Sequence, residues 1–294
     1  MITRLHVRRF RSIRALDLEL SPLTALVGPN GSGKSTVLAA LNPRNELTPT
    51  WRHEREAASV ERITNVGTTI SGHVNGLFPT LGVQTLRLEL DALRRESIVE
   101  RASILSSNGS NISNVIGSMT RERQALLASE FSKRIPAIRD LDVFPTTSGK
   151  HQLRFHDRWS ETEFSPDEVS DGTLLLLAFL AAKFQPTRPD ILAVEEPERG
   201  LHPYLLGELV RLLRELTTGP NALQVVLATH SAELLEHLNP AEVRFLSRSP
   251  DDGNVLVRSV DPTSADWPRY FREFDDSLGG AWLSGGLGGT PQSH

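Results

Sequence analysis

The sequence contains no cysteine among its 294 residues, which excludes disulfide bonds and cysteine-ligated zinc. It also lacks any apolar run near the roughly 18 residues that a membrane-spanning helix needs. Arginines occupy the N-terminus where a signal peptide would have its apolar segment. No internal repeat occurs, and no heptad pattern persists long enough for an extended coiled coil. These absences predict a soluble, cytoplasmic protein with no membrane partner.

Strong net charge is absent as well. A formal charge of −4 argues against a protein coated with positive charge for binding nucleic acid. Basic side chains are nevertheless concentrated before the first acidic residue, Asp17. This stripe is either a contact surface for phosphates of ATP or of a polynucleotide, or the solvated face of an amphipathic first strand. Its members are Arg4, Arg8, Arg9, Arg11 and Arg14.

Hydrophobic periodicity predicts an alternation of strands and helices. Apolar residues alternate over 2–20, as in half-buried strands, and the second half of the chain alternates strand with helix, which implies a parallel sheet covered on both faces. The predicted strands are 23–27, 83–90, 191–194 and 223–228. The predicted helices are 33–41, 120–134, 174–182, 203–216 and one after Ser231. The segments 44–80 and 106–118 are predicted to be irregular.

A glycine-rich loop follows the buried strand 23–27 and has the P-loop pattern. Its glycines let successive backbone N–H groups surround the β- and γ-phosphates, and the next helix directs its positive end at the same anion. Lys34 supplies a point charge, and Ser35 offers a hydroxyl to Mg²⁺. A chance glycine-rich turn is the alternative, but the flanking strand and helix are the context that the motif requires. The predicted ATP-binding residues are Gly28, Pro29, Asn30, Gly31, Ser32, Gly33, Lys34, Ser35 and Thr36.

Carboxylates follow a second buried strand, 191–194, as Glu195-Glu196-Pro197-Glu198. Ligands bind at the carboxyl edge of parallel sheets, so these groups are expected beside the phosphates. Glu195 is predicted to hold Mg²⁺ through its water shell, and Glu196 to polarise the attacking water as general base. Such carboxylates can also cap a helix, but their combination with the P-loop favours catalysis.

Two further candidate groups lie at a strand end and at a helix start. His230 ends the strand in VVLATHS (225–231) and is either structural or a sensor of the γ-phosphate; its place after the carboxylate strand favours the sensor. The predicted catalytic residues are therefore Lys34, Glu196 and His230. Ser170-Asp171-Gly172 begins an apolar helix, where it can cap the helix or bind an anion, and spacing alone does not decide.

These segments, in this order, resemble the ABC-type ATPase heads of the RecF, SMC and OLD-like group, in particular compact AAA family ATPases related to RecF. Phe10-Arg11-Ser12-Ile13, Leu201-His202-Pro203 and the glycine-rich segment 279–289 extend the resemblance over most of the chain. It implies an α/β P-loop NTPase of ABC-ATPase type, with a mixed or parallel sheet core, an antiparallel β lobe and a helical signature lobe. ATP and Mg²⁺ are the implied cofactors.

The resemblance also assigns roles. Ser170, Asp171 and Gly172 are similar to the signature motif that reaches ATP bound on a partner subunit, which implies a homodimer on ATP binding. The loop 198–202 is similar to one lining that interface, and Arg11 serves the nucleotide. ABC enzymes generally have aspartate where this sequence has Glu195, whose longer side chain still reaches the ion through water. The Mg²⁺-sensing glutamine is not clearly marked, and Gln84 is the candidate.

One two-lobed head is expected, with 1–95 as the N-terminal β lobe, 96–185 as the inserted signature lobe, 186–260 as the Walker B and switch-histidine core, and 261–294 as a glycine-rich segment. A flexible end is typical of the tail's composition, whereas the resemblance argues against one. The group's long coiled coils do not fit into the about 135 residues between Lys34 and Ser170. An OLD-type nuclease domain does not fit into the about 45 residues after Phe245.

The first functional hypothesis is an ATP-hydrolysing head that dimerises around ATP and serves DNA repair, DNA maintenance or defence against foreign DNA. This role rests on the resemblance alone. The second is a nucleotide-gated adaptor whose bound state recruits a separate effector protein, with slow incidental turnover. A membrane transporter's ATPase subunit is a third, disfavoured by Glu195-Glu196-Pro197-Glu198 and by the RecF-like opening and tail.

Overall fold

The computed structural model describes residues 1–42, 59–64, 69–73 and 82–288. The chain divides into two compact units. We call the first the core unit; it comprises Met1–Thr85, Asp190–Glu198 and Leu216–His294. We call the second the inserted unit; it comprises Leu86–Pro189 and Arg199–Glu215. The signature lobe predicted at 96–185 falls within the inserted unit, which also takes a second, later segment of the chain.

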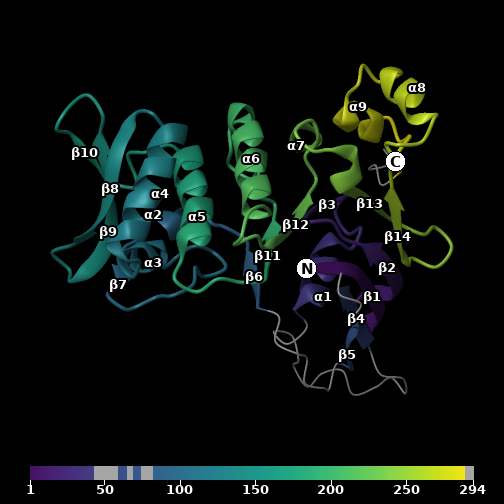
Figure 1. Cartoon of the computed structure of the whole chain (residues 1–294), viewed down its shortest axis with the longest axis horizontal. Coiled ribbons are helices and arrows are strands. Elements are labelled where there is room, and N and C mark those ends of the chain that lie inside the picture. Colours follow the sequence, from purple (N-terminus) through teal and green to yellow (C-terminus); the bar gives the residue numbers. More distant parts are fainter. Residues whose placement is uncertain (43–58, 65–68, 74–81, 289–294) are drawn as a thin grey trace. The chain divides into compact units, whose positions relative to one another are not determined.

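A six-stranded sheet in the order β14-β13-β3-β12-β11-β6 forms the centre of the core unit (Figure 1). Strands β3, β11 and β12 are parallel, and β13 extends them in parallel on the other side of β3. The predicted strands and the parallel sheet are thus confirmed, although the strand expected over 83–90 already ends at Leu86. The bounds are β3 Leu23–Val27, β6 Val83–Leu86, β11 Ile191–Glu195, β12 Gln224–Thr229, β13 Val243–Arg248 and β14 Val255–Ser259.

Helix α1 (Lys34–Leu41) follows β3 and buries Val37, Leu38 and Leu41. These side chains join a core that includes Leu26 of β3 and Val226 of β12. Every residue of β3 and β12 is buried, as expected for parallel strands covered on both faces. This burial holds the strand ends, and therefore the loops after them, in fixed positions.

A second, antiparallel sheet of the core unit has the order β2-β1-β4-β5. Its strands are β1 Ile2–Phe10, β2 Ile13–Glu19, β4 Ser59–Thr64 and β5 Thr69–His73. The prediction that 44–80 is irregular is wrong for β4 and β5. Strand β4 pairs with β1, and β5 pairs with β4, so this polar segment has backbone hydrogen-bonding partners that composition does not reveal. The glycines and proline at 67, 76 and 79 lie outside the described residues.

Three members of the N-terminal arginine stripe form ion pairs within the core unit. Arg4 contacts Glu19 at 2.7 Å, and the side chains of Arg8 and Arg14 lie 3.7 and 3.5 Å from Asp17 and Asp252. These arginine side chains are about half exposed or more, and each faces a carboxylate. The pairs favour a solvated strand face over a polynucleotide contact.

The C-terminal segment is folded up to residue 288. Helices α8 (Trp267–Arg272) and α9 (Leu278–Leu283) follow β14, and Trp282 of α9 is buried. Glu236, just after α7 (Ala232–Leu235), accepts hydrogen bonds from the Ser277 hydroxyl and the Gly279 N–H, at 2.6 and 2.8 Å. The flexible-end interpretation is therefore wrong for this helix.

The inserted unit combines helices with an antiparallel sheet, in which β9 pairs with β7, β8 and β10 (Figure 1). Phe131 of α4 and Phe155 of β9 are fully buried, with ring centroids 6.1 Å apart. The predicted helices are confirmed, but 106–118 is not wholly irregular because α3 lies there. The bounds are α2 Leu90–Arg94, β7 Ser97–Ile98, α3 Ile112–Gly117, α4 Arg121–Arg134, β8 Ile138–Pro145, β9 Lys150–Asp157, β10 Glu163–Phe164, α5 Asp171–Phe184, the 3₁₀ turn Pro203–Leu205 and α6 Leu206–Leu216.

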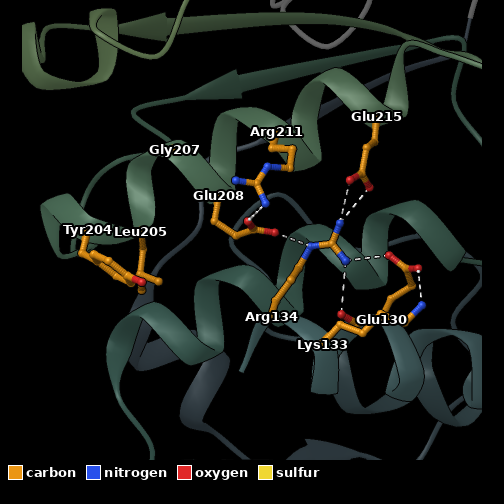
Figure 2. A pocket seen from close by; sticks show the side chains of 9 residues that line it. All are labelled: Glu130, Lys133, Arg134, Tyr204, Leu205, Gly207, Glu208, Arg211 and Glu215. Carbon is orange, nitrogen blue, oxygen red and sulfur yellow. Dashed lines mark hydrogen bonds and ion pairs between the residues drawn. The ribbon is translucent and has the colours of Figure 1, made fainter. Parts of the chain in front are cut away.

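A cavity of about 560 Å³ in the inserted unit is lined by charged residues of α4 and α6 (Figure 2). Arg134 lies at its centre, nearly buried, and pairs with Glu130, Glu208 and Glu215 at 2.6 to 2.8 Å. Burial works to raise the pKa of Glu130, but the hydrogen bond from Arg134 and the charge of Lys183 outweigh it and hold that pKa below its usual value. These ion pairs join α4 to α6, so we regard the cavity as structural.

Candidate functional site

The P-loop connects β3 to α1 at the carboxyl edge of the parallel sheet. Val27 pairs with Thr229, and Glu195 pairs with Ala228, so the ends of β3, β11 and β12 lie in adjacent positions. Gly33 has φ +108°, a left-handed conformation that suits glycine, and a Cβ there would lie 2.7 Å from Val255. The loop therefore has the strand-to-helix geometry that directs backbone N–H groups toward a phosphate.

Lys34 is folded back over this loop. Its ammonium group donates hydrogen bonds to the carbonyl oxygens of Gly28 and Pro29, at 2.6 and 2.9 Å. Burial lowers the pKa of Lys34, and the charges of Glu196, Glu198 and Glu195 oppose that shift. A partly desolvated cation is thus held where the P-loop pattern predicts contact with the β- and γ-phosphates.

Ser35 and Glu195 bring the two predicted Mg²⁺ oxygens together. The Ser35 hydroxyl donates a hydrogen bond to the Glu195 carboxylate, although 160 residues separate them. Among the described residues, no cluster of three or more acidic, histidine or cysteine side chains is placed to bind a metal ion unaided. Mg²⁺ typically takes one or two protein oxygens and completes its shell with water and substrate phosphates. The pair fits that ion, and Ser35 and Glu195 are the residues that would hold it.

Glu196 and His230 lie opposite each other on the loops after β11 and β12. The Glu196 carboxylate is 3.4 Å from His230 Nδ1, and the Glu196 N–H donates to the carbonyl of Ala228 at 2.8 Å. Glu196 has φ +48°, an uncommon conformation for a residue other than glycine that clusters at active sites. The structure therefore brings together the predicted base and the predicted γ-phosphate sensor.

A third carboxylate, Glu198, is bonded to Thr229, the residue that precedes His230. The Thr229 hydroxyl donates to Glu198 Oε1 at 2.5 Å, and the Ser231 N–H donates to the same hydroxyl at 3.0 Å. Burial raises the pKa of Glu198, more than the hydrogen bond from Thr229 lowers it. From the sequence, Glu198 was placed only at the start of a predicted interface loop.

Arg248, at the end of β13, is a site residue that the sequence reasoning missed. Its guanidinium donates to the carbonyls of Gly31, Ser12 and Gly253 at 2.9 to 3.0 Å, and to the Ser12 hydroxyl at 2.9 Å. It therefore links the P-loop, the β1–β2 turn and the β13–β14 turn. No local pattern marks it, because Gly31 and Arg248 are 217 residues apart.

Arg248→Met is expected to weaken ATP binding about tenfold, because the P-loop carbonyl and the neighbouring turn lose a shared donor worth roughly 1–2 kcal/mol. Equilibrium titration with a fluorescent ATP analogue measures this change. Arg154→Met, which removes an arginine from the inserted unit, is the matched control and should bind as the wild type does. Equal dissociation constants for both variants would contradict the role given to Arg248.

Arg11 and Gln84, the two other candidates for the nucleotide and Mg²⁺ site, lie in different parts of the core unit. Arg11 is exposed in the β1–β2 turn, where the hydroxyl of the adjacent Ser12 is 3.4 Å from that of Thr36 in the P-loop motif. Gln84 is buried on β6, two residues after Gly82, whose carbonyl accepts from the Ile191 N–H at the start of β11. Gln84 therefore lies in the sheet near the N-terminal end of β11, whereas Glu195 lies at the C-terminal end of that strand. The roles of both residues stay predictions.

The signature residues lie in the inserted unit, at the start of α5. The Ser170 hydroxyl accepts from the Thr173 N–H at 3.2 Å, which is an N-cap, and the Asp171 carboxylate pairs with Arg94 at 2.5 Å. A Cβ on Gly172 would lie 2.4 Å from Leu205. The cap is thus present, and Asp171 is neutralised beside the positive helix end. The anion-binding role stays a prediction.

Comparison with known families supports the ATPase assignment. Residues 75–236, more than half of the chain, match the family described as "AAA domain, putative AbiEii toxin, Type IV TA system". Residues 1–44 match the family described as "AAA ATPase domain". The first match includes the predicted signature, Glu195 and Glu196, and the second includes the P-loop.

Curated relatives include a nuclease and transporter ATPases. An OLD nuclease of Thermus scotoductus is 55% identical over 88% of this chain, which spans 64% of that protein. A "putative ABC transporter ATP-binding protein" of Streptomyces avermitilis is 31% identical over 80% of this chain and 34% of its own length. The phosphate import ATP-binding protein PstB of Mycobacterium intracellulare is 25% identical over 95% of this chain and 86% of its own. The chain spans less than two thirds of the first two relatives.

Solved structures of SMC heads share the fold. An SMC head bound to the C-winged helix domain of ScpA aligns with a TM-score of 0.58 and 16% identity, over 88% of this chain and 98% of that one. The SMC head domain of Thermotoga maritima gives a TM-score of 0.51 and 17% identity, over 88% and 99% of the two chains. These matches confirm the predicted α/β P-loop fold of ABC-ATPase type. None of the described helices has the length and hydrophobicity needed to cross a bilayer.

Proposed function

Because this chain belongs to the AAA-domain ATPases and is an ABC-type ATPase of the OLD, RecF and SMC-like kind, we propose that it binds ATP with Mg²⁺ in the core unit and hydrolyses it. The observation that carries this proposal is the convergence of Lys34, Ser35 and Glu195 with Glu196 and His230 at one sheet edge. These groups come from three separate strand ends and have the chemistry that phosphoryl transfer to water needs.

Each residue has a distinct task in this proposal. Lys34 and the backbone N–H groups of the P-loop bind the phosphates and stabilise the charge that develops on them. Glu196 accepts a proton from the attacking water, and His230 orients the γ-phosphate from the opposite loop. Mg²⁺, when bound by Ser35 and Glu195, neutralises phosphate charge.

We further propose that two copies of the chain close around ATP and that the ATPase acts on DNA. Ser170, at the start of α5, is the group that would complete the γ-phosphate contacts of a second copy. The DNA role is supported by the identity to a relative named OLD nuclease. The competing function, an adaptor for an effector protein, is favoured by two SMC heads of the same fold that are described as bound to domains of ScpA.

Steady-state ATPase assays with and without DNA distinguish these roles. A DNA-directed ATPase is expected to turn over several-fold faster with duplex or single-stranded DNA. Turnover that is slow and indifferent to DNA, together with a protein that co-purifies with the ATP-bound chain, would support the adaptor instead. The chain carrying Lys34→Ala is the control for contaminating ATPases.

A further inference from the structure

Glu198 is a partly buried carboxylate to which the proposed function gives no task. Its Oε1 accepts from the Thr229 hydroxyl, whereas its Oε2 is buried and makes no hydrogen bond to any other residue that the structure describes. Leaving a polar atom unpaired in the interior destabilises a protein, so such groups are typical of functional positions. A purely structural contact between the two loops would be served at least as well by an apolar side chain.

Thr229, the partner of Glu198, is the last residue of β12 and is fully buried. Its hydroxyl donates to Glu198 and accepts from the Ser231 N–H, the N-cap residue of α7. His230 lies between these two bonded residues. The bond from the Ser231 N–H to the Thr229 hydroxyl therefore closes a turn around the His230 backbone. Because Glu198 holds that hydroxyl, it also influences where the His230 ring lies.

Glu196 is held by the same pair of loops. Its N–H donates to Ala228, which directly precedes Thr229, and Glu198 follows it by two residues. The loop after β11 is thus joined to the end of β12 on both sides of the Glu196 side chain. These bonds fix the backbone positions from which the Glu196 and His230 side chains extend, and the Glu196 carboxylate and His230 Nδ1 lie 3.4 Å apart.

We infer that the Glu198–Thr229 hydrogen bond positions Glu196 and His230 for hydrolysis, and that both residues are positioning residues of the ATPase site. This inference rests on the proposed function. It assigns to Glu198, two residues after Glu196, a task in turnover in place of a task in metal or nucleotide binding. Loss of this hydrogen bond is therefore expected to lower kcat while the affinity for ATP persists.

The hydrogen bond itself can be tested by paired substitutions. Glu198→Met and Thr229→Val remove the acceptor and the donor at similar volume, and each is expected to lower kcat about 10- to 100-fold, because small misplacements of reacting groups have effects of that size. Glu198→Gln and Thr229→Ser keep the bond and should stay within about threefold of the wild type. The double variant Glu198→Met/Thr229→Val should be no slower than the slower single variant, since each single variant already removes the bond that the two residues share.

Two controls separate positioning from a general loss of structure. Thr24→Val removes an equally buried hydroxyl of neighbouring strand β3, whose hydrogen bonds within the described part of the chain are all to Ser21, and should leave kcat unchanged. Dissociation constants for a fluorescent ATP analogue should stay within about threefold in all variants. The inference is overturned if Glu198→Met turns over like the wild type, if affinity falls as much as kcat, or if Thr24→Val is equally slow. A wild-type chain that releases no phosphate contradicts the proposed function, and the positioning role then fails with it.

Discussion

A chain carrying Lys34→Ala is expected to lose productive ATP binding. The ammonium group of Lys34 is held by the carbonyls of Gly28 and Pro29 and is the cation of the P-loop itself. Charge-assisted hydrogen bonds contribute roughly 1.5–3 kcal/mol each, so losing two phosphate contacts should weaken binding by about 3 kcal/mol or more, a factor of at least about 10² in Kd.

Equilibrium titration with a fluorescent ATP analogue measures this loss directly. Lys133→Ala is the matched control, because it removes the same charge from an exposed position in the inserted unit and should bind ATP as the wild type does. Thermal melting of both variants verifies that the fold persists. An unchanged dissociation constant and unchanged turnover in Lys34→Ala would show that the P-loop is not the ATP site.

Glu196→Gln is expected to trap ATP and to accumulate as a dimer. Glutamine keeps the shape of the side chain and removes the proton acceptor, so hydrolysis should fall by about 10² or more while ATP stays bound. The P-loop covers one side of the triphosphate, and in a symmetric dimer the signature segment of each copy would cover the other side of its partner's ATP. Binding then drives association by mass action.

Two substitutions at Ser170 separate a steric block of the proposed interface from loss of the α5 N-cap. Ser170→Ala removes the N-cap and destabilises the helix by about 1 kcal/mol, without adding bulk. Ser170→Arg removes the cap and also fills the space that a second copy's ATP would occupy. In the Glu196→Gln background, Ser170→Ala, which also loses the hydroxyl contact to ATP, should form a weaker ATP-dependent dimer, and Ser170→Arg should be monomeric.

Light scattering coupled to size exclusion, with and without ATP and Mg²⁺, measures the mass. A mass for Glu196→Gln that is the same in both conditions contradicts ATP-driven dimerisation. An ATP-dependent dimer of the Ser170→Arg double variant contradicts the shared site while leaving the ATPase assignment intact.

The parts of the site that the sequence predicted are those whose signal is local. The P-loop and the carboxylates after β11 each lie within a few residues of a buried strand, so a hydrophobic run followed by a short motif was sufficient to identify them. His230 was found in the same way. Adjacency of the three strand ends followed from the parallel sheet, which alternating strands and helices imply.

The contacts that the sequence did not predict join distant segments. Arg248 bonds to Gly31 across 217 residues, and Glu198 bonds to Thr229 across 31, with no spacing rule to indicate either. The polar strands β4 and β5 were missed for the same reason, because β4 pairs with the distant strand β1 and β5 pairs with β4, and composition indicates neither pairing. Helix α3 lies in a segment rich in serine and asparagine, where local propensity favours loops.

Hydrolysis at the core unit is measured by phosphate release from the purified chain with Mg²⁺ and ATP, compared with the Glu196→Gln variant prepared identically. Repeated turnover by the wild type is expected, with dependence on Mg²⁺ and a rate about 10² lower in the variant, which still binds ATP. Absence of phosphate release from the wild type, or release by Glu196→Gln at the wild-type rate, would contradict the assignment of an ATP-hydrolysing site to the core unit.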